Sequence, residues 1–273
     1  MTDLDGTLLN TNMSVSRLTV ETLNWLMDRG MNISYATSRS HYTASMILSE
    51  IHFSLPCITY NGVFVVIPRS GDVMRSNLLD PVMCDDVVKI GDSMGLTPYV
   101  FGRTSCAEEK LLYSPPRNIA QCRFIKERAA RQDKRLQPMS TSCRLADVIN
   151  MSYLYPLDDM LRLRAALERD YGPDISIKLV KDIYSSGYFS LEIAHPQANK
   201  GAMLAFVCDV VGVPLEHVSV FGDQANDLAM FRLAGTRIAV DNACQEVKES
   251  ADLIIGGNDE DGVSRYLSTV CGV

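Results

Sequence analysis

Two aspartates stand two positions apart near the start of the chain, in the segment Asp3-Leu4-Asp5-Gly6-Thr7. In an extended segment such residues point to the same side, so Asp3 and Asp5 can face one site, and Gly6 permits a sharp turn after them. Two carboxylates this close repel by about 4 kcal/mol at an effective dielectric of roughly 20, unless a cation or a shared proton relieves them. One could then attack phosphorus while the other protonates the leaving oxygen. For this motif alone, the alternative is a solvated turn rich in aspartate.

Two further segments carry groups suited to binding phosphate. Thr37-Ser38-Arg39 follows a predicted strand, so its hydroxyl and backbone N–H groups can face a ligand at the carboxyl edge of a parallel sheet. Lys200 follows the predicted helix N-cap Asn199, where a cation opposes the helix dipole by about 0.3–1 kcal/mol. That position is favourable when an anion lies between the lysine and the helix. An ordinary exposed lysine is the alternative.

The segment Gly222-Asp223-Gln224-Ala225-Asn226-Asp227 follows a predicted buried strand and opens a helix. Asn226 or Asp227 could simply cap that helix, but capping does not account for Asp223. Asp223 would bring a third carboxylate to the sheet edge at which open α/β proteins bind ligands. Converging carboxylates call for a hard divalent cation, and Mg²⁺ with phosphate is the natural combination.

Short apolar strands alternate with helices at both ends of the chain. The pattern predicts helices over 16–29, 41–51, 200–211 and 244–250, and strands over 32–37, 56–60, 63–67, 218–221, 237–240 and 253–255. This alternation indicates an α/β fold with a doubly wound, mostly parallel, Rossmann-like core sheet covered on both faces.

The middle of the chain has a different pattern. Asp80-Pro81 predicts an N-cap with proline at the first helical position, opening a helix to about Met94. The remaining predicted elements are strands near 97–101, 109–113, 145–153, 174–181 and 187–193 and a helix at 157–170. Together they indicate an α+β domain, residues 77–190, inserted into a core made of residues 1–76 and 191–273.

These motifs together resemble the haloacid dehalogenase-like (HAD) superfamily, and more narrowly its Cof-type branch of sugar phosphatases. The resemblance rests on Asp3-x-Asp5-Gly6-Thr7-Leu8-Leu9, Thr37-x-Arg39, Asn199-Lys200-Gly201 and Gly222-Asp223-x-x-Asn226-Asp227. The insert matches the α+β cap of that branch in position and length, and Asn61-Gly62 matches a turn common in it. The resemblance implies that the inserted cap determines substrate specificity.

The resemblance also implies an activity and a set of roles. It implies a Mg²⁺-dependent phosphatase that hydrolyses a small phosphorylated metabolite, such as a sugar phosphate, through an aspartyl-phosphate on Asp3. Asp5 would be the general acid/base, and Thr37 and Lys200 would hold the phosphoryl oxygens. The implied metal ligands are Asp3, Asp5 (through its carbonyl), Asp223 and Asp227 (through water or by orienting the site). The implied phosphate- and substrate-binding residues are Thr37, Ser38, Arg39, Asn61, Lys200 and Asn226.

The chain departs from the family pattern at two places. Ser38 stands where the family usually has glycine. Serine would strain the backbone if that position needs a positive φ. Only Met1 and Thr2 precede Asp3, whereas a nucleophile of this kind normally ends a buried strand of several residues. Either the chain is shortened or the central strand is very brief.

Composition excludes several classes of function. The 273-residue chain carries a formal charge of −7, which argues against a nucleic-acid partner because such binding needs a basic surface. With no apolar run of membrane-spanning length and no basic segment at the start, we expect neither a membrane span nor a secretory signal. The eight cysteines include no Cys-x-x-Cys pair, so we expect reduced thiols, mostly in the core of a cytoplasmic protein. The sequence predicts no oligomeric state.

One charged segment allows two interpretations. Residues 117–135 could form a solvated cap helix or a basic surface that attracts an anionic substrate. Its seven basic residues are Arg117, Arg123, Lys126, Arg128, Arg131, Lys134 and Arg135.

Three rival functions use the same residues. A phosphoryl transferase or phosphomutase would form the same intermediate but protect it from water. A phospho-accepting signalling module would be much shorter and would lack both an acid/base at the position of Asp5 and a cap. A catalytically inactive binding protein ranks last, because all the matching motif residues except Ser38 are present.

Overall fold

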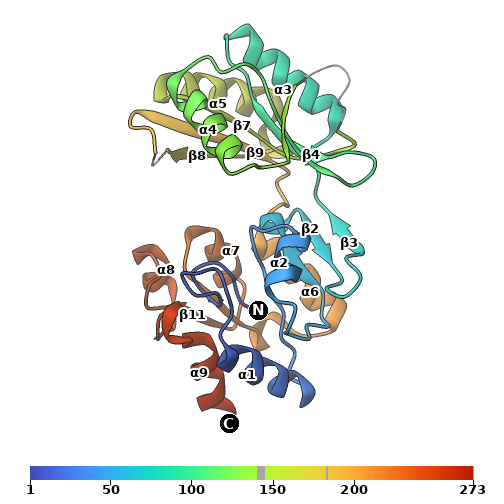
Figure 1. Ribbon diagram of the computed structural model, residues 1–273, viewed down its shortest axis with the longest axis vertical. Coiled ribbons are helices and arrows are strands. Elements are labelled where there is room, and N and C mark those ends of the chain that lie inside the picture. Colours follow the sequence, from blue (N-terminus) through green and yellow to red (C-terminus); the bar gives the residue numbers. More distant parts are fainter. Residues whose placement is uncertain (140–144, 183, 273) are drawn as a thin grey trace. The chain divides into compact units, whose positions relative to one another are not determined.

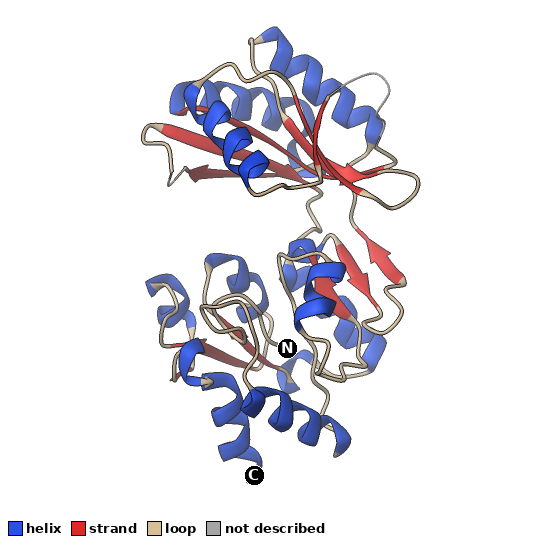
Figure 2. Ribbon diagram, in the orientation of Figure 1, coloured by secondary structure: helices blue, strands red, loops and turns tan. Residues whose placement is uncertain are grey.

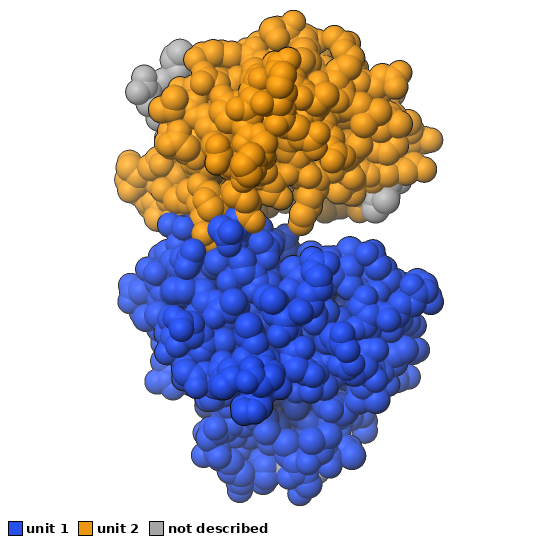
Figure 3. Space-filling model, turned by 180° about the vertical axis from the view of Figure 1, so that it is seen from behind, with its two compact units in different colours: residues 1–76, 197–273 blue, residues 77–196 orange. Residues whose placement is uncertain are grey.

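A computed structural model describes residues 1–139, 145–182 and 184–272. The chain forms two compact units, coloured separately in Figure 3: a core unit, Met1–Ser76 with Gln197–Val273, and an inserted unit, Asn77–Pro196. The chain returns to the core after Pro196 rather than after residue 190. The return is later than expected because strand β9, Tyr188–Ala194, continues the sheet of the inserted unit.

A parallel sheet forms the centre of the core unit. Strands β10 (Ser219–Gly222), β11 (Thr236–Val240) and β12 (Leu253–Ile255) pair in parallel. The chain start joins this sheet, because Thr2 forms parallel bridges with both Phe221 and Tyr35. The predicted strand over 32–37 thus forms only isolated β-bridges, and Met1 to Asp3 form a very short central segment of the sheet.

The sheet continues on its other side into a hairpin. Strand β1 (Cys57–Thr59) is bridged in parallel to Ala36 and pairs antiparallel with β2 (Phe64–Val66). Strand β3 (Val73–Ser76), which has no counterpart among the predicted strands, adds to β2. The expected Asn-Gly turn connects β1 to β2.

Helices cover this sheet, as Figures 1 and 2 show. They are α1 (Arg17–Asp28), α2 (His41–Ile47), α6 (Lys200–Val211), α7 (Leu228–Phe231), α8 (Gln245–Ser250) and α9 (Gly262–Cys271). Helix α1 packs on α9, while α6 packs on α7 and β1. The predicted α/β class is confirmed.

The inserted unit is an α+β domain built on one six-stranded sheet in the order β6-β5-β4-β7-β9-β8. Its other strands are β4 (Tyr99–Arg103), β5 (Glu109–Tyr113), β6 (Leu136–Pro138), β7 (Asp147–Pro156) and β8 (Ser176–Lys181). Its helices are α3 (Pro81–Ser93), α4 (Ile119–Ala130) and α5 (Leu157–Tyr171). Asp80 caps α3 as predicted, accepting from the backbone N–H groups of Val82 and Met83.

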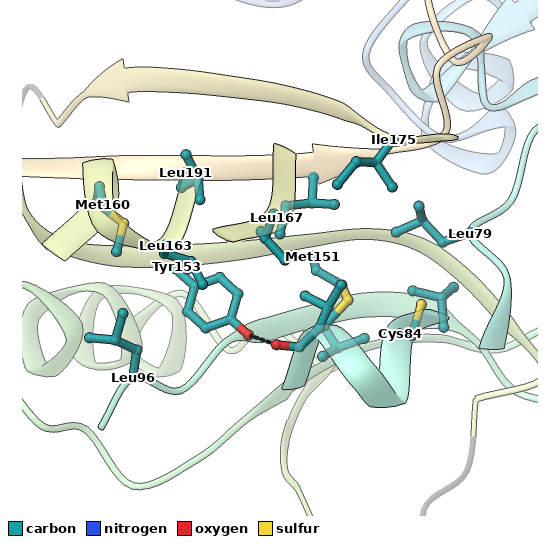
Figure 4. Packing of buried hydrophobic residues seen from close by; sticks show 14 of the residues in the cluster. Leu79, Cys84, Leu96, Met151, Tyr153, Met160, Leu163, Leu167, Ile175 and Leu191 are labelled. Carbon is teal, nitrogen blue, oxygen red and sulfur yellow. Dashed lines mark hydrogen bonds between the residues drawn. The ribbon is translucent and has the colours of Figure 1, made fainter. Parts of the chain in front are cut away.

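Helices cover both faces of this sheet. Helices α3 and α5 pack on one face, in an apolar cluster that includes Val100. Figure 4 shows Met151 and Tyr153 in this cluster. Helix α4 packs on the other face, against Tyr99 and Leu154. Side chains alternate along a strand, so neighbouring residues such as Tyr99 and Val100 serve opposite layers.

Two expectations drawn from composition can be compared with the structure. The seven cysteines among the described residues are all free thiols, but only Cys57, Cys84 and Cys208 are buried, so the expectation of mostly buried cysteines holds for three of them. Cys143 lies outside the described residues. Within the described ranges, no helix combines the length and apolar character needed to cross a membrane.

Candidate active site

The carboxyl ends of neighbouring parallel segments of the sheet bring the predicted motifs together. Asp3 ends the central segment, residues 1–3, and its backbone N–H donates to the Phe221 carbonyl at 3.0 Å. Asp223 follows β10 on one side of this segment, and Thr37 follows the bridged segment 34–36 on the other. The sheet therefore places motifs 34 and 220 residues after Asp3 along one edge, as strand parallelism predicts.

Lys200 is the cation of this edge, and it is not an exposed lysine. It is 1% exposed and begins α6 directly after the N-cap Asn199, whose side chain accepts from the Ala202 N–H at 2.8 Å. Its ammonium donates to Asp3 Oδ1 and to Asp227 Oδ1, both at 2.6 Å. Lys200 thus joins two of the motifs directly.

Hydrogen bonds hold the two other carboxylates in place. Asp227 Oδ2 accepts from the backbone N–H groups of Asp223 and Gln224, at 3.0 and 3.1 Å. Asp223 accepts from the Thr7 hydroxyl at 3.0 Å and from the Gln224 amide at 3.2 Å. No role was predicted for Thr7 or Gln224, although Thr7 lies in the Asp3 motif and Gln224 in the Asp223 motif.

The arrangement fits a divalent cation. The carboxylates of Asp3, Asp223 and Asp227 are all buried, and one oxygen from each lies within 4.8 Å of the others. Once all three carboxylates are ionised, the single ammonium of Lys200 leaves two negative charges unbalanced in a site shielded from water. Oxygen ligands of this kind bind hard divalent cations such as Mg²⁺.

The same burial perturbs the ionisation of the site. Burial raises the pKa of Asp3 to about 8, with Lys200 opposing the shift and Asp227 reinforcing it. Burial alone would lower the pKa of Lys200, but Asp3 and Asp227 outweigh it and raise that pKa above its ordinary value. Lys200 therefore remains a cation, and Asp3 is the group whose proton a metal must displace.

We expect Mg²⁺ affinity to rise with pH. Below about pH 8 the Asp3 carboxyl of the metal-free protein holds a proton, so each unit of decrease should weaken binding by about tenfold. Above that pH the affinity should level off. Calorimetric titrations with Mg²⁺ between about pH 6 and 9 would measure this, and in Asp3→Asn the slope should disappear. An affinity independent of pH would exclude Asp3 as a titrating ligand.

Gly6 is required for the close packing of the first motif on the third. Its φ is +76°, and a Cβ there would lie 2.4 Å from Asp223 Oδ2. We expect Gly6→Ala to abolish the thermal stabilisation of the protein by Mg²⁺, because the added methyl group would displace the Asp223 carboxylate from the cluster. The left-handed backbone should cost about 1–2 kcal/mol as well.

Gly30 provides the matched control for this variant. Its φ is +87°, but nothing lies within 4 Å of its Cβ position. Gly30→Ala should therefore lose similar backbone stability while keeping the full Mg²⁺ response. Thermal unfolding with and without Mg²⁺ measures both variants, and a full response in Gly6→Ala would show that the methyl group does not disturb the ligands.

The second motif contacts Asp5 in the structure. Arg39, expected to contact substrate, donates from Nε to both Asp5 oxygens, at 3.0 and 2.9 Å. The Thr37 hydroxyl accepts from the Arg39 N–H at 3.1 Å, so the two residues form one folded turn. Ser38 is exposed and does not have a positive φ, so serine causes no backbone strain there.

The Asn-Gly turn joins three of the motifs. The N–H of Asn61 donates to the Thr37 carbonyl at 2.9 Å, and its side-chain oxygen accepts from Asn226 at 3.0 Å. A Cβ at Gly62 would lie 2.5 Å from the Asn199 carbonyl oxygen, so only glycine allows this approach to α6. Asn226, which was expected to bind phosphate, is therefore held by Asn61 in the structure.

Comparison with known proteins identifies the family. Residues 1–267 match the sequence profile of the haloacid dehalogenase-like hydrolases. The chain therefore belongs to this family, and the predicted resemblance is confirmed.

Several relatives are similar along nearly the whole chain. One is the 5-amino-6-(5-phospho-D-ribitylamino)uracil phosphatase YitU of Bacillus subtilis (strain 168), 24% identical over 97% of this chain and 94% of its own. Another is the pyridoxal phosphate phosphatase YbhA of Escherichia coli (strain K12), 22% identical over 97% and 95%. A haloacid dehalogenase-like hydrolase from Bacteroides thetaiotaomicron has the same fold, with a TM-score of 0.74, 24% identity and 98% and 97% coverage. The subclass IIB sugar phosphatase BT4131 has a TM-score of 0.71 at 20% identity, with 100% and 98% coverage.

Proposed function

We propose that the chain is a Mg²⁺-dependent phosphatase that hydrolyses a small phosphorylated metabolite through an aspartyl-phosphate on Asp3. The observation that carries this proposal is the buried cluster of Asp3, Asp223, Asp227 and Lys200, in which three carboxylates face a single ammonium. Such a cluster is costly in an empty site and is useful when a cation and a phosphoryl group occupy it.

Asp3 and Asp223 would hold Mg²⁺ by their carboxylates and Asp5 by its backbone carbonyl. The hydrogen bonds to both oxygens of Asp227 favour an orienting role, or contact through water, for that residue. When bound, the ion would neutralise charge on the transferring phosphoryl group.

The chain's own residues would perform the proton and phosphoryl transfers. An oxygen of Asp3 attacks phosphorus as the bond to the leaving oxygen breaks, and Asp5 gives that oxygen a proton. Asp5 then takes a proton from water, which attacks the same phosphorus and releases inorganic phosphate from Asp3. Lys200 and Thr37 would hold the phosphoryl oxygens, assisted by Ser38 and Asn226. Arg39 would orient Asp5 through its paired contact.

The inserted unit, Asn77–Pro196, would select the alcohol part of the substrate. The relatives above are named for a phosphorylated ribitylaminouracil and for pyridoxal phosphate, both small monoesters. We therefore propose a small phosphate monoester, a sugar phosphate or a molecule of similar size, as the substrate class.

An assay of phosphate release tests the reaction class. Purified protein would be given a panel of sugar phosphates, nucleotides and p-nitrophenyl phosphate, with Mg²⁺ and with chelator. Release that requires metal supports the proposal. Phosphorylated protein that passes its phosphate to a second sugar instead of to water would indicate a transferase or mutase, and no release from any ester would overturn the proposal.

Asp5→Ala tests the assigned acid/base. The variant should still form the phospho-enzyme from an ester with a good leaving group, but hydrolysis of that intermediate should fall by about 10²–10⁴-fold. Mass spectrometry of the intact protein after mixing with p-nitrophenyl phosphate would detect the trapped adduct. Full turnover in this variant would contradict the role of Asp5.

A further inference from the structure

The basic segment after β5 is only partly balanced by acids. Arg123 pairs with Glu127 at 2.7 Å, and Arg117 donates to a backbone carbonyl. Among the residues that the structure describes, Lys126, Arg131 and Lys134 have no ion pair within 4.0 Å. The segment therefore retains net positive charge on a protein whose overall charge is −7.

A pocket of about 490 Å³ lies beside this segment, between the end of α4 and Tyr184. Figure 1 labels α4 and β8 in the inserted unit. The pocket is lined by Phe124, Glu127, Arg128, Arg131, Asp133, Arg135 and Tyr184. Two aromatic rings, three guanidinium groups and two carboxylates thus line one cavity, and Arg123 pairs with the Glu127 carboxylate at 2.7 Å.

Two of the three arginines of this pocket have fixed partners, whereas Arg131 is exposed. Arg128 lies over the Phe124 ring, 4.4 Å from its centroid, and Arg135 lies 5.6 Å from the centroid of Phe101. Asp133 accepts from Arg128 Nη1 at 3.0 Å and from Arg135 Nε at 2.8 Å. One carboxylate therefore orients two guanidinium groups, and Glu109 lies 3.8 Å from Arg135 as a second acid beside them.

Tyr184 provides an accessible aromatic wall. Its side chain is 60% exposed, and the Arg123 guanidinium lies 5.6 Å from its ring centroid and also donates to its backbone carbonyl. Arginine and aromatic side chains together bind flat π systems by stacking. Guanidinium N–H groups that make no hydrogen bond within the protein can bind carboxylate or phosphate oxygens.

We propose that this pocket binds a small planar aromatic anion. The ring would stack against Tyr184 and Phe124, and the acidic group would pair with Arg131 and the remaining donors of Arg128. The anion is either the organic part of a substrate or a separate molecule, and these two sources share the chemistry that the pocket recognises. Binding of the aromatic anion in this pocket does not depend on the proposed phosphatase activity.

Calorimetric titration of the full chain with 2-naphthoate tests the proposal. We expect saturable binding that is about fivefold or more tighter than binding of cyclohexanecarboxylate, which has the same charge but no aromatic ring. Arg131→Gln and Tyr184→Ala should each weaken naphthoate binding by about fivefold or more. Arg162→Gln, at an exposed arginine of α5 outside the pocket, should bind as the wild type does.

Steady-state kinetics then separate the two sources. If Arg131→Gln lowers kcat/KM for 6-carboxy-2-naphthyl phosphate, which keeps a carboxylate beside the ring, but not for glycerol 3-phosphate, the anion belongs to the substrate. If it weakens naphthoate binding while both kcat/KM values stay unchanged, the pocket binds a separate molecule. Naphthoate binding that is equal to that of cyclohexanecarboxylate, or that is unaffected by both pocket variants, would overturn the proposal whether or not the protein hydrolyses phosphate esters.

Discussion

Asp3→Asn is expected to reduce Mg²⁺-dependent phosphate release by about 10⁴-fold or more. The amide has nearly the shape of the carboxylate and can still accept the hydrogen bond that Lys200 donates to Oδ1. It has no anionic oxygen to attack phosphorus, so the proposed intermediate cannot form. The measurement is phosphate release from the best ester of the panel, at saturating Mg²⁺.

The fold of this variant should survive. Burial raises the pKa of Asp3 to about 8, so in the metal-free protein ionisation of this group opposes folding as pH increases through neutrality. Replacing it with a neutral amide removes that cost, and the metal-free unfolding temperature should stay the same or rise. The Mg²⁺-induced rise in unfolding temperature should shrink, because one ligand loses its charge.

Asp209→Asn is a suitable control. Asp209 is an exposed aspartate of α6, outside the buried carboxylate cluster, so its replacement should alter neither activity nor the Mg²⁺ response. If Asp3→Asn kept a tenth of the wild-type rate, the nucleophile would have to lie elsewhere and the proposed mechanism would be wrong.

The sequence was sufficient to predict which motifs meet, because residues that follow parallel strands all lie at the same edge of the sheet. Apolar strands that alternate with helices predict such a sheet, so Asp3, Thr37 and Asp223 could be grouped from the sequence alone. The N-caps at Asp80 and Asn199 were likewise predictable, since local hydrogen bonds to the first helical N–H groups define them.

Contacts of long side chains could not be predicted in this way. Arg39 can extend several ångströms, and only the packed structure shows that its partner is Asp5. The three-residue strand β6 carries no usable periodicity, and the boundary at residue 190 was early because β9 ends only at Ala194. Asn61-Gly62 indicated the turn after β1, but nothing indicated that Tyr60 would adopt a φ of +50° in it, which is unusual for a bulky residue.

Lys200→Met should both destabilise the protein and abolish activity. Methionine fills a similar volume but leaves Asp3 and Asp227 buried without their shared cation, 2.6 Å from each carboxylate in the wild type. Removing one partner of a buried ion pair typically costs about 3–5 kcal/mol. Urea unfolding in chelator would measure this loss, and added Mg²⁺ should restore part of the stability without restoring phosphate release, because no cation remains to hold the phosphoryl oxygens.

A double variant separates the charge of Lys200 from its packing. If the cost comes from an uncompensated carboxylate, Lys200→Met/Asp227→Asn should be more stable than Lys200→Met alone, since one orphaned charge is gone. Lys248→Met is the matched control, because Lys248 reaches Asp241 only at 3.4 Å on the surface and such pairs contribute about 1 kcal/mol or less. Were Lys200→Met to unfold within about 1 kcal/mol of the wild type in chelator, the Lys200 ammonium would not be needed to balance charge in the metal-free site, and that site would carry less negative charge for a cation than its three carboxylates suggest.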